Sequence, residues 1–210
     1  MSLFITFEGI EGSGKSTQIP LLAQKLRDLH HPVIVTREPG GCPLADRIRR
    51  LLLCPDQEPM APEAELMLYM AARAQHMREV ILPALVKNII VLCDRFSDAT
   101  TAYQGIARGL DTAFIENINR FVTSGRRPDL TLLFDLPAEE GLRRSRRRNQ
   151  DCGIETDRLE RESLDFHRRV REGYLRLAAG DPERFRTLDA SLPVAAVSAA
   201  VAAAVLPFLS

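Results

Sequence analysis

A glycine-rich loop near the start of the chain limits the possible folds more than any other feature. Residues Gly9 to Ser16 read G-I-E-G-S-G-K-S, which fits the pattern G-x-x-x-x-G-K-[ST]. The apolar run Leu3–Phe7 before the loop is typical of a buried strand, and residues of helical period follow it. In this context the loop N–H groups and the helix amino terminus bind phosphate oxygens. The pattern therefore predicts a P-loop nucleotide-binding domain.

Alternating apolar runs and helical segments predict the rest of the architecture. The expected strands are Leu3–Phe7, Val33–Thr36, Ile89–Cys93, Leu130–Phe134 and, more weakly, Arg184–Leu188, and the helical segments include Leu21–Leu29, Ala64–Leu85 and Leu159–Ala179. Buried parallel strands are nearly continuous apolar runs, and strand–helix alternation is typical of βαβ units. We therefore expect one α/β domain over residues 1–210, with a parallel sheet and helices on both faces.

The overall charge gives no indication of a nucleic-acid or membrane partner. The 210 residues contain 28 Lys and Arg against 28 Asp and Glu, so the formal net charge is zero. Four cysteines lie without paired spacing, which favours a reduced cytoplasmic protein over a disulfide-stabilised one. Met1–Phe4 lacks the basic flank and long apolar run of a signal peptide. Val194–Leu209 is apolar but short for a membrane span, so we expect a docked final helix.

The phosphate loop also assigns individual roles. Lys15 is expected to reach the β- and γ-phosphates, and the Ser16 hydroxyl is a candidate ligand of Mg²⁺. The expected ATP-binding residues of the loop are Gly9, Ile10, Glu11, Gly12, Ser13, Gly14, Lys15, Ser16 and Thr17. Switch GTPases, motor ATPases and small-molecule kinases all carry such a loop, so the motif alone does not identify the reaction.

Two charged residues after the third expected strand favour a kinase. No N-K-x-D segment of a guanine-specific switch is present. The strand Ile89–Cys93 ends in Asp94 and Arg95, where open α/β sheets bind ligands, rather than in the paired acidic residues of motor ATPases. A cation beside the carboxylate suggests a second anionic substrate, although the two could also be only an ion pair at a strand end.

Further motifs, in order along the chain, identify a family. They are T-R-E-P-G-G at Thr36–Gly41, Y-M-A-A-R at Tyr69–Arg73, D-R-F at Asp94–Phe96, A-Y-Q-G at Ala102–Gly105 and D-R-L-E at Asp157–Glu160. Together with the loop they make the chain resemble bacterial thymidylate kinase from about Leu3 to Asp189. The resemblance implies a nucleoside-monophosphate-kinase fold with a five-stranded parallel sheet and a lid, transfer of the ATP γ-phosphoryl group to dTMP with Mg²⁺ to give dTDP for dTTP synthesis, and a homodimer.

The resemblance also implies roles around the acceptor nucleotide. Arg95 and Arg37 would face the acceptor phosphate, Asp94 would be the magnesium-side or acceptor-side carboxylate, Tyr69 would stack on the base and Arg73 would donate to thymine O4. Thr100 and Gln104 would bond the pyrimidine edge, Tyr103 would crowd the ribose 2′ position, and Glu11 would bond the 3′-hydroxyl. Tyr69 and Arg73, at i and i+4, share one helix face. The alternatives are a core aromatic for Tyr69, a helix cap for Thr100 and a surface contact for Gln104.

A polar stretch near the end of the core is expected to form the lid, residues 146–157. The arginine run Arg143 to Arg148 leads into it, and most of these side chains are expected on a solvated helix face. The resemblance is to the class with a catalytic arginine in the lid, which points to Arg148, with Arg146 or Arg147 as substitutes and Arg143 along the adenine. The expected catalytic set is thus Lys15, Asp94, Arg95 and Arg148.

Two other functions stay open on these residues. One is a kinase of a different deoxynucleoside or nucleoside monophosphate, and the other is a nucleotide-binding regulator without catalysis. Arg95 favours an acceptor that already carries phosphate. The intact set Lys15, Ser16, Asp94 and Arg95 argues against an inactive site.

Overall fold

The core of the protein is a sheet of five parallel strands, as the apolar runs predict. The computed structural model describes residues 2–55, 59–153 and 155–209. The sheet order is β2-β3-β1-β4-β5, and every neighbouring pair is parallel. Its strands are β1 (Phe4–Glu8), β2 (Val33–Arg37), β3 (Ile90–Asp94), β4 (Leu130–Asp135) and β5 (Phe185–Asp189). The predicted fold class is confirmed.

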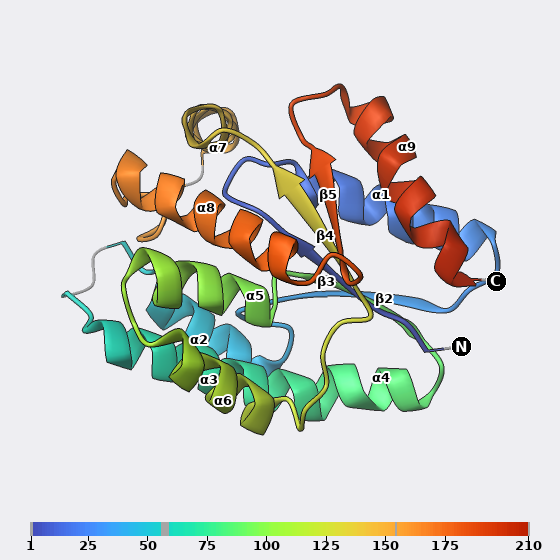
Figure 1. Cartoon of the computed structure of the whole chain (residues 1–210), viewed down its shortest axis with the longest axis horizontal. Helices are drawn as coiled ribbons and strands as arrows, with labels where there is room; N and C mark the ends of the chain where they lie inside the picture. Colours follow the sequence, from blue (N-terminus) through green and yellow to red (C-terminus); the bar gives the residue numbers. More distant parts are fainter. Residues whose placement is uncertain (1, 56–58, 154, 210) are drawn as a thin grey trace.

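Helices cover both faces of this sheet (Figure 1). They are α1 (Lys15–Asp28), α2 (Pro43–Leu53), α3 (Pro62–His76), the π-helical η1 (Met77–Ile81), α4 (Leu82–Val86), α5 (Ser97–Thr100), the π-helical η2 (Thr101–Ala107), α6 (Thr112–Val122), α7 (Ala138–Cys152), α8 (Leu164–Gly180), α9 (Val194–Val205) and the 3₁₀ turn η3 (Leu206–Leu209). One face of the sheet packs against α1 and α9, and the other against α4 and α8.

Burial along the strands follows the sheet order. Central strands β1, β3 and β4 are almost entirely buried, whereas most positions of the edge strands β2 and β5 are half-buried or exposed. An edge strand has a neighbour on one side only, so its side chains need not all be apolar. This explains why the run at Arg184–Leu188 predicts its strand only weakly.

Three helix boundaries differ from the expected ones. The first helix begins at Lys15 rather than Leu21, because the phosphate loop leads directly into it. The expected segment Ala64–Leu85 contains the π-helical turn η1, and Pro83, which has no N–H to donate to Glu79, follows that turn. The expected segment Leu159–Ala179 starts instead at Leu164, where the Ser163 side chain accepts a bond from Phe166 N at 3.2 Å.

The stretch predicted as an irregular lid is partly helical. Helix α7 continues through Cys152 and ends at Gly153, which has the left-handed φ of 62° typical of a helix end. Ser145 and Asn149, four residues apart, are buried on one face of α7 and both bond to Glu160. This buried polar face stabilises the helix where the polar sequence predicts a loop. Within the expected lid 146–157, residue 154 lies outside the described residues.

The apolar end of the chain forms a docked helix, as expected. Val197, Val201 and Val205 of α9 recur every four residues and are buried in the main core cluster. Gln18 in α1 donates to the Val194 carbonyl at 3.0 Å and joins the two helices. No helix in the described part of the chain is long and apolar enough to cross a bilayer.

Candidate active site

A cavity lies at the carboxyl ends of the strands, and the residues that follow β1, β2 and β3 line it. The phosphate loop follows β1, Glu38 follows β2, and Asp94 and Arg95 follow β3. The loop connections from β1 and from the adjacent β3 run in opposite directions, which is where open α/β sheets bind ligands. The predicted residues that line the cavity are Glu11, Gly12, Ser13, Gly14, Lys15, Ser16, Tyr69, Arg73, Asp94, Arg95, Thr100, Tyr103, Gln104 and Arg148.

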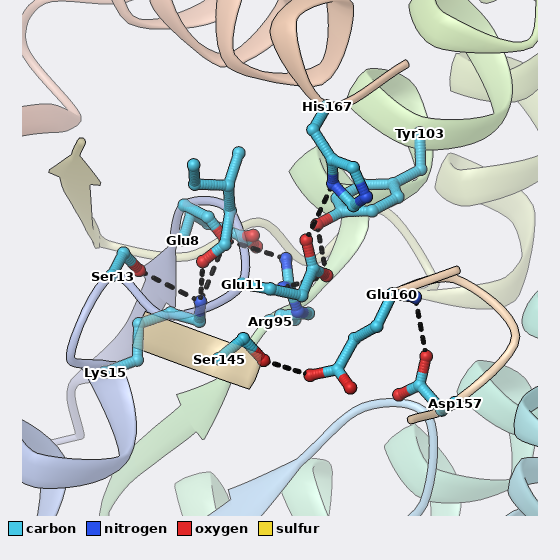
Figure 2. Close-up of polar contacts among 12 residues, drawn as sticks. Glu8, Glu11, Ser13, Lys15, Arg95, Tyr103, Ser145, Asp157, Glu160 and His167 are labelled. Carbon is cyan, nitrogen blue, oxygen red and sulfur yellow. Dashed lines mark hydrogen bonds and ion pairs between the residues drawn. The ribbon is translucent and has the colours of Figure 1, made fainter. Parts of the chain in front are cut away.

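The phosphate loop is held in shape by its glycines and by Lys15. The Lys15 ammonium donates to the Gly9 and Ile10 carbonyls at 2.8 and 2.9 Å and to the Ser13 hydroxyl (Figure 2). Gly12 has φ of 70°, and a Cβ there would lie 2.1 Å from the Gly141 carbonyl. Burial, and then the charge of Arg95, lower the pKa of Lys15 to about 8. Lys15 thus holds the loop residues Gly9, Ile10 and Ser13 together.

Arg95 has an unusual backbone that turns its side chain toward the loop. Its φ of 69° lies in the left-handed region, which is uncommon outside glycine and often found at functional sites. The guanidinium donates to the Gly9 carbonyl at 2.9 Å, to Glu11 at 2.9 Å and to the Tyr174 hydroxyl at 3.1 Å. It also lies over the Tyr103 ring, 5.0 Å from its centroid. Arg95 therefore connects the phosphate loop to η2 and α8.

Glu11 points away from the loop's phosphate-binding side, toward η2 and α8. One of its carboxylate oxygens accepts from both Arg95 and the Tyr103 hydroxyl, at 2.9 and 2.6 Å, and the other lies 3.2 Å from His167 Nδ1 (Figure 2). Burial opposes ionisation, but the Arg95 charge, the nearby His167 ring and the bond from Tyr103 outweigh it and lower the pKa of Glu11 well below its usual range. An acidic residue is thus accommodated in an anion-binding loop because two hydrogen-bond donors, Arg95 and Tyr103, and the His167 ring surround it.

Glu8, at the end of β1, is fully buried beside this group. Its carboxyl accepts from the Phe96 backbone N–H and from the Tyr174 hydroxyl, both at 2.7 Å. Burial, reinforced by the charge of Asp98, raises the pKa of Glu8 to about 8. The folded protein therefore binds a proton at Glu8 between its ordinary pKa near 4.5 and about 8, where the unfolded chain does not.

This shift predicts a loss of stability as pH rises. Between pH 5 and pH 9 the free energy of unfolding of the wild type should fall relative to that of Glu8→Gln, because the variant carries no proton to lose. The difference should be on the order of a few kcal/mol, at about 1.4 kcal/mol per pKa unit. Urea unfolding of both proteins at several pH values measures it, and a pH-independent difference contradicts the assignment.

The expected base-binding residues lie on the α3 and η2 sides of the cavity. Tyr69 and Arg73 both line it, as their i, i+4 spacing predicts. The Thr100 hydroxyl is buried and has no hydrogen-bond partner among the described residues. Gln104 donates its amide to Glu65 at 2.7 Å. Arg37 is half-exposed in an ion pair with Asp46 and does not line the cavity.

The arginines of α7 divide between two sides of the helix. Arg148 lines the main cavity and also a second groove beside the phosphate loop, which Thr17 and Arg144 share. Arg143, Arg146 and Arg147 line a different groove on α7. Arg143 is exposed and paired with Glu140, so the structure places Arg144 rather than Arg143 next to the loop. A shift of one residue turns a side chain by about 100° around a helix.

Several cavity residues carry no prediction from the sequence. Asp157, Glu160 and Glu38 lie within motifs already noted, so the motifs could have indicated them. Arg49 lines the cavity where Arg37 was expected. His167 of α8 is fully buried behind Glu11, and only the buried position of its helical face could have suggested it.

Comparison with known proteins agrees with this geometry. Residues 7–201 match the family model for thymidylate kinase. The thymidylate kinase of Geotalea uraniireducens (strain Rf4) is 56% identical over 211 residues, covering 100% of this chain and 99% of the relative. That of Trichlorobacter lovleyi is 54% identical over 209 residues, covering 99% of both. The crystal structure of thymidylate kinase from Ehrlichia chaffeensis superposes with a TM-score of 0.77 at 33% identity, covering 100% of this chain and 99% of the other. The chain belongs to the thymidylate kinase family.

Proposed function

We propose that this protein transfers the γ-phosphoryl group of ATP to dTMP and releases dTDP and ADP. The observation that carries the proposal is the direct contact between Arg95 and the phosphate loop, through Gly9 and Glu11. A cation suited to an acceptor phosphate therefore lies beside the loop suited to the donor triphosphate. The family names of the relatives support dTMP as the acceptor.

The reaction needs the two nucleotides in line. An oxygen of the dTMP phosphate attacks the γ-phosphorus, and the bond between that phosphorus and the β,γ-bridging oxygen breaks. Arg95 would bind the acceptor phosphate through its fork of donors and direct the attack. Lys15 and Arg148 would hold the β- and γ-phosphate oxygens from the loop side and from α7. Glu11 would bond the 3′-hydroxyl, which fixes the distance between the acceptor and the loop.

Two residues have the chemistry to hold the Mg²⁺ that accompanies ATP. Oδ1 of Asp94 is buried and has no hydrogen-bond partner among the described residues, and Ser16 lines the same cavity. A carboxylate oxygen and a hydroxyl suit this hard cation, which usually keeps several waters and binds phosphate oxygens as well. When bound, Mg²⁺ would neutralise charge on the β- and γ-phosphates. Asp94→Asn should weaken Mg²⁺-dependent ATP binding, measurable by titration with and without the ion.

Nucleotide specificity tests the proposal. The wild-type protein should phosphorylate dTMP with much higher kcat/KM than dCMP or UMP, because donors would face the base edge and Tyr103 would crowd the ribose 2′ side. A coupled assay of ADP release, with a panel of nucleosides and monophosphates, measures this. Comparable values for dTMP, dCMP and UMP contradict the assigned base-reading residues. Turnover with nucleosides alone indicates a nucleoside kinase, and no turnover indicates a regulator.

We also infer a homodimer and a cytoplasmic location. Exposed apolar side chains gather on neighbouring helices, with Met67 on α3 and Phe114 and Phe121 on α6, and Phe121 is 84% exposed. A second copy covering this face would remove that surface from water. Sedimentation equilibrium should give twice the mass of one chain and single mass for Phe121→Glu. The four free thiols favour a reducing compartment, which cell fractionation tests.

A further inference from the structure

A line of buried polar side chains runs from Glu38, which lines the cavity, back to His76 and Thr36, which do not line it, and the mechanism above does not use it. The Thr36 hydroxyl is 2.6 Å from His76 Nε2, and His76 Nδ1 is 3.0 Å from Glu38 Oε1. The second Glu38 oxygen accepts from Arg73 Nε at 2.7 Å. All four side chains are at most 9% exposed. We call Thr36, His76 and Glu38 the buried relay.

The bonding pattern assigns the direction of each hydrogen bond. A carboxylate only accepts, so Nδ1 of His76 donates to Glu38, and in the neutral ring Nε2 accepts from the Thr36 hydroxyl. The ring lies close to Gly41, where only glycine leaves space for it, because a Cβ there would lie 2.5 Å from His76 Nε2. The relay therefore holds one oxygen of the Glu38 carboxylate through His76, while the other oxygen binds Arg73.

Arg73 has almost no freedom once Glu38 is fixed. Of the five N–H groups of its guanidinium, four are used by Glu38, Asn119, Met70 and the Phe96 carbonyl. The group also lies over the Phe96 ring, 5.2 Å from the centroid. One N–H on Nη2 has no partner within residues 2–55, 59–153 and 155–209, and Arg73 lines the cavity. The side chain thus offers one directed donor.

We propose that the buried relay is a positioning device that makes Arg73 select a carbonyl over an amino group at the pyrimidine 4-position. The proposal rests on the proposed function, in which Arg73 faces that position. A fixed N–H pairs with a carbonyl oxygen, but it faces another donor when an amino group stands there, and both then stay unpaired. His76 touches no substrate; it acts through Glu38. Loosening Arg73 lets it turn away from an amino group, so discrimination falls.

The ratio of kcat/KM for dTMP to that for dCMP separates positioning from general stability. In His76→Leu this ratio should fall at least about tenfold, which corresponds to about 1.4 kcal/mol of lost discrimination. His76→Asn, whose amide can place an N–H near the position of Nδ1, should recover part of the ratio. Val205→Ala is the matched control: it removes buried apolar atoms from α9, which packs against α1 and β5 away from Arg73, so it should lower the Tm and leave the ratio unchanged.

The possible outcomes distinguish failure of the relay proposal from failure of the proposed dTMP kinase function. A wild-type ratio in folded His76→Leu, or an equal fall in Val205→Ala, overturns the relay while dTMP phosphorylation by the wild type still stands. If His76→Leu does not fold, Glu38→Gln decides, because it keeps the shape and removes the charge that holds Arg73; its ratio should fall at least about tenfold, and an unchanged ratio overturns the relay. Absence of dTMP turnover in the wild type overturns the proposed function itself.

Discussion

Replacing Arg95 with alanine should lower kcat/KM for dTMP by roughly 10²–10³, because removing one donor that stabilises charge in the transition state costs about 2.7–4 kcal/mol and each 1.4 kcal/mol is a factor of ten. Arg95→Lys should still lose at least about tenfold, since an ammonium cannot form the paired bonds of a guanidinium with a phosphate. Steady-state kinetics with dTMP and ATP varied separately measure both variants. The loss should fall mainly on the dTMP parameters and on kcat, with little change in the KM for ATP.

Arg171 provides a matched control for this experiment. It also makes a bidentate pair, with Asp135 at 2.6 and 2.9 Å, near the carboxyl end of β4. It does not line the main cavity. Arg171→Lys should therefore keep near-normal kinetics. Wild-type kinetics in Arg95→Lys, or an equal loss in Arg171→Lys, shows that Arg95 only holds the loops together.

The left-handed backbone of Arg95 illustrates what sequence alone cannot give. The motif at Asp94–Phe96 predicts a functional arginine at the end of a strand, and the structure places it there. Its turn toward Gly9 depends on Tyr174, whose hydroxyl bonds to both Arg95 and Glu8, and the bond to Glu8 joins residues 166 positions apart. No pattern of neighbouring residues can predict a contact between residues so far apart in the sequence. Motifs therefore predict which residues lie together at the cavity, and tertiary contacts decide how each side chain is oriented.

Helix α7 shows that prediction of the fold from sequence is limited in the same way. Strands were predictable because an apolar run needs burial wherever it occurs, and all five were found. The polar residues Ser145 and Asn149 predict exposure, yet both are buried because Glu160, from a separate turn, accepts their hydrogen bonds. A polar side chain can be buried only when such a partner is present. The partner here comes from outside the helix, so the sequence of α7 alone predicts a lid.

Arg148→Ala should lower activity more than either Arg95 variant does, and the loss should appear in kcat. The phosphate loop has no basic residue among its variable positions Ile10 to Ser13, so charge on the migrating phosphoryl group must be met from elsewhere. A supplied arginine accounts for about 10³–10⁵ in the rate of phosphoryl transfer. We expect kcat to fall by about 10³ or more, with a change of less than about tenfold in the KM for ATP. The reason is that Arg148 would bind the migrating phosphoryl group mainly in the transition state.

The other arginines of α7 are the natural controls, because they lie on the same helix and differ in direction. Arg148 is half-exposed at the cavity, where Glu160 accepts from it at 2.8 Å, whereas Arg146 and Arg147 line the separate groove. Alanine variants of Arg146 and Arg147 should therefore keep near-normal kcat. If Arg148→Ala also keeps it, the charge comes from another cation, and Arg158 is the next to test. If instead the KM for ATP rises while kcat is unchanged, Arg148 binds ATP equally in the ground and transition states and does not accelerate the transfer.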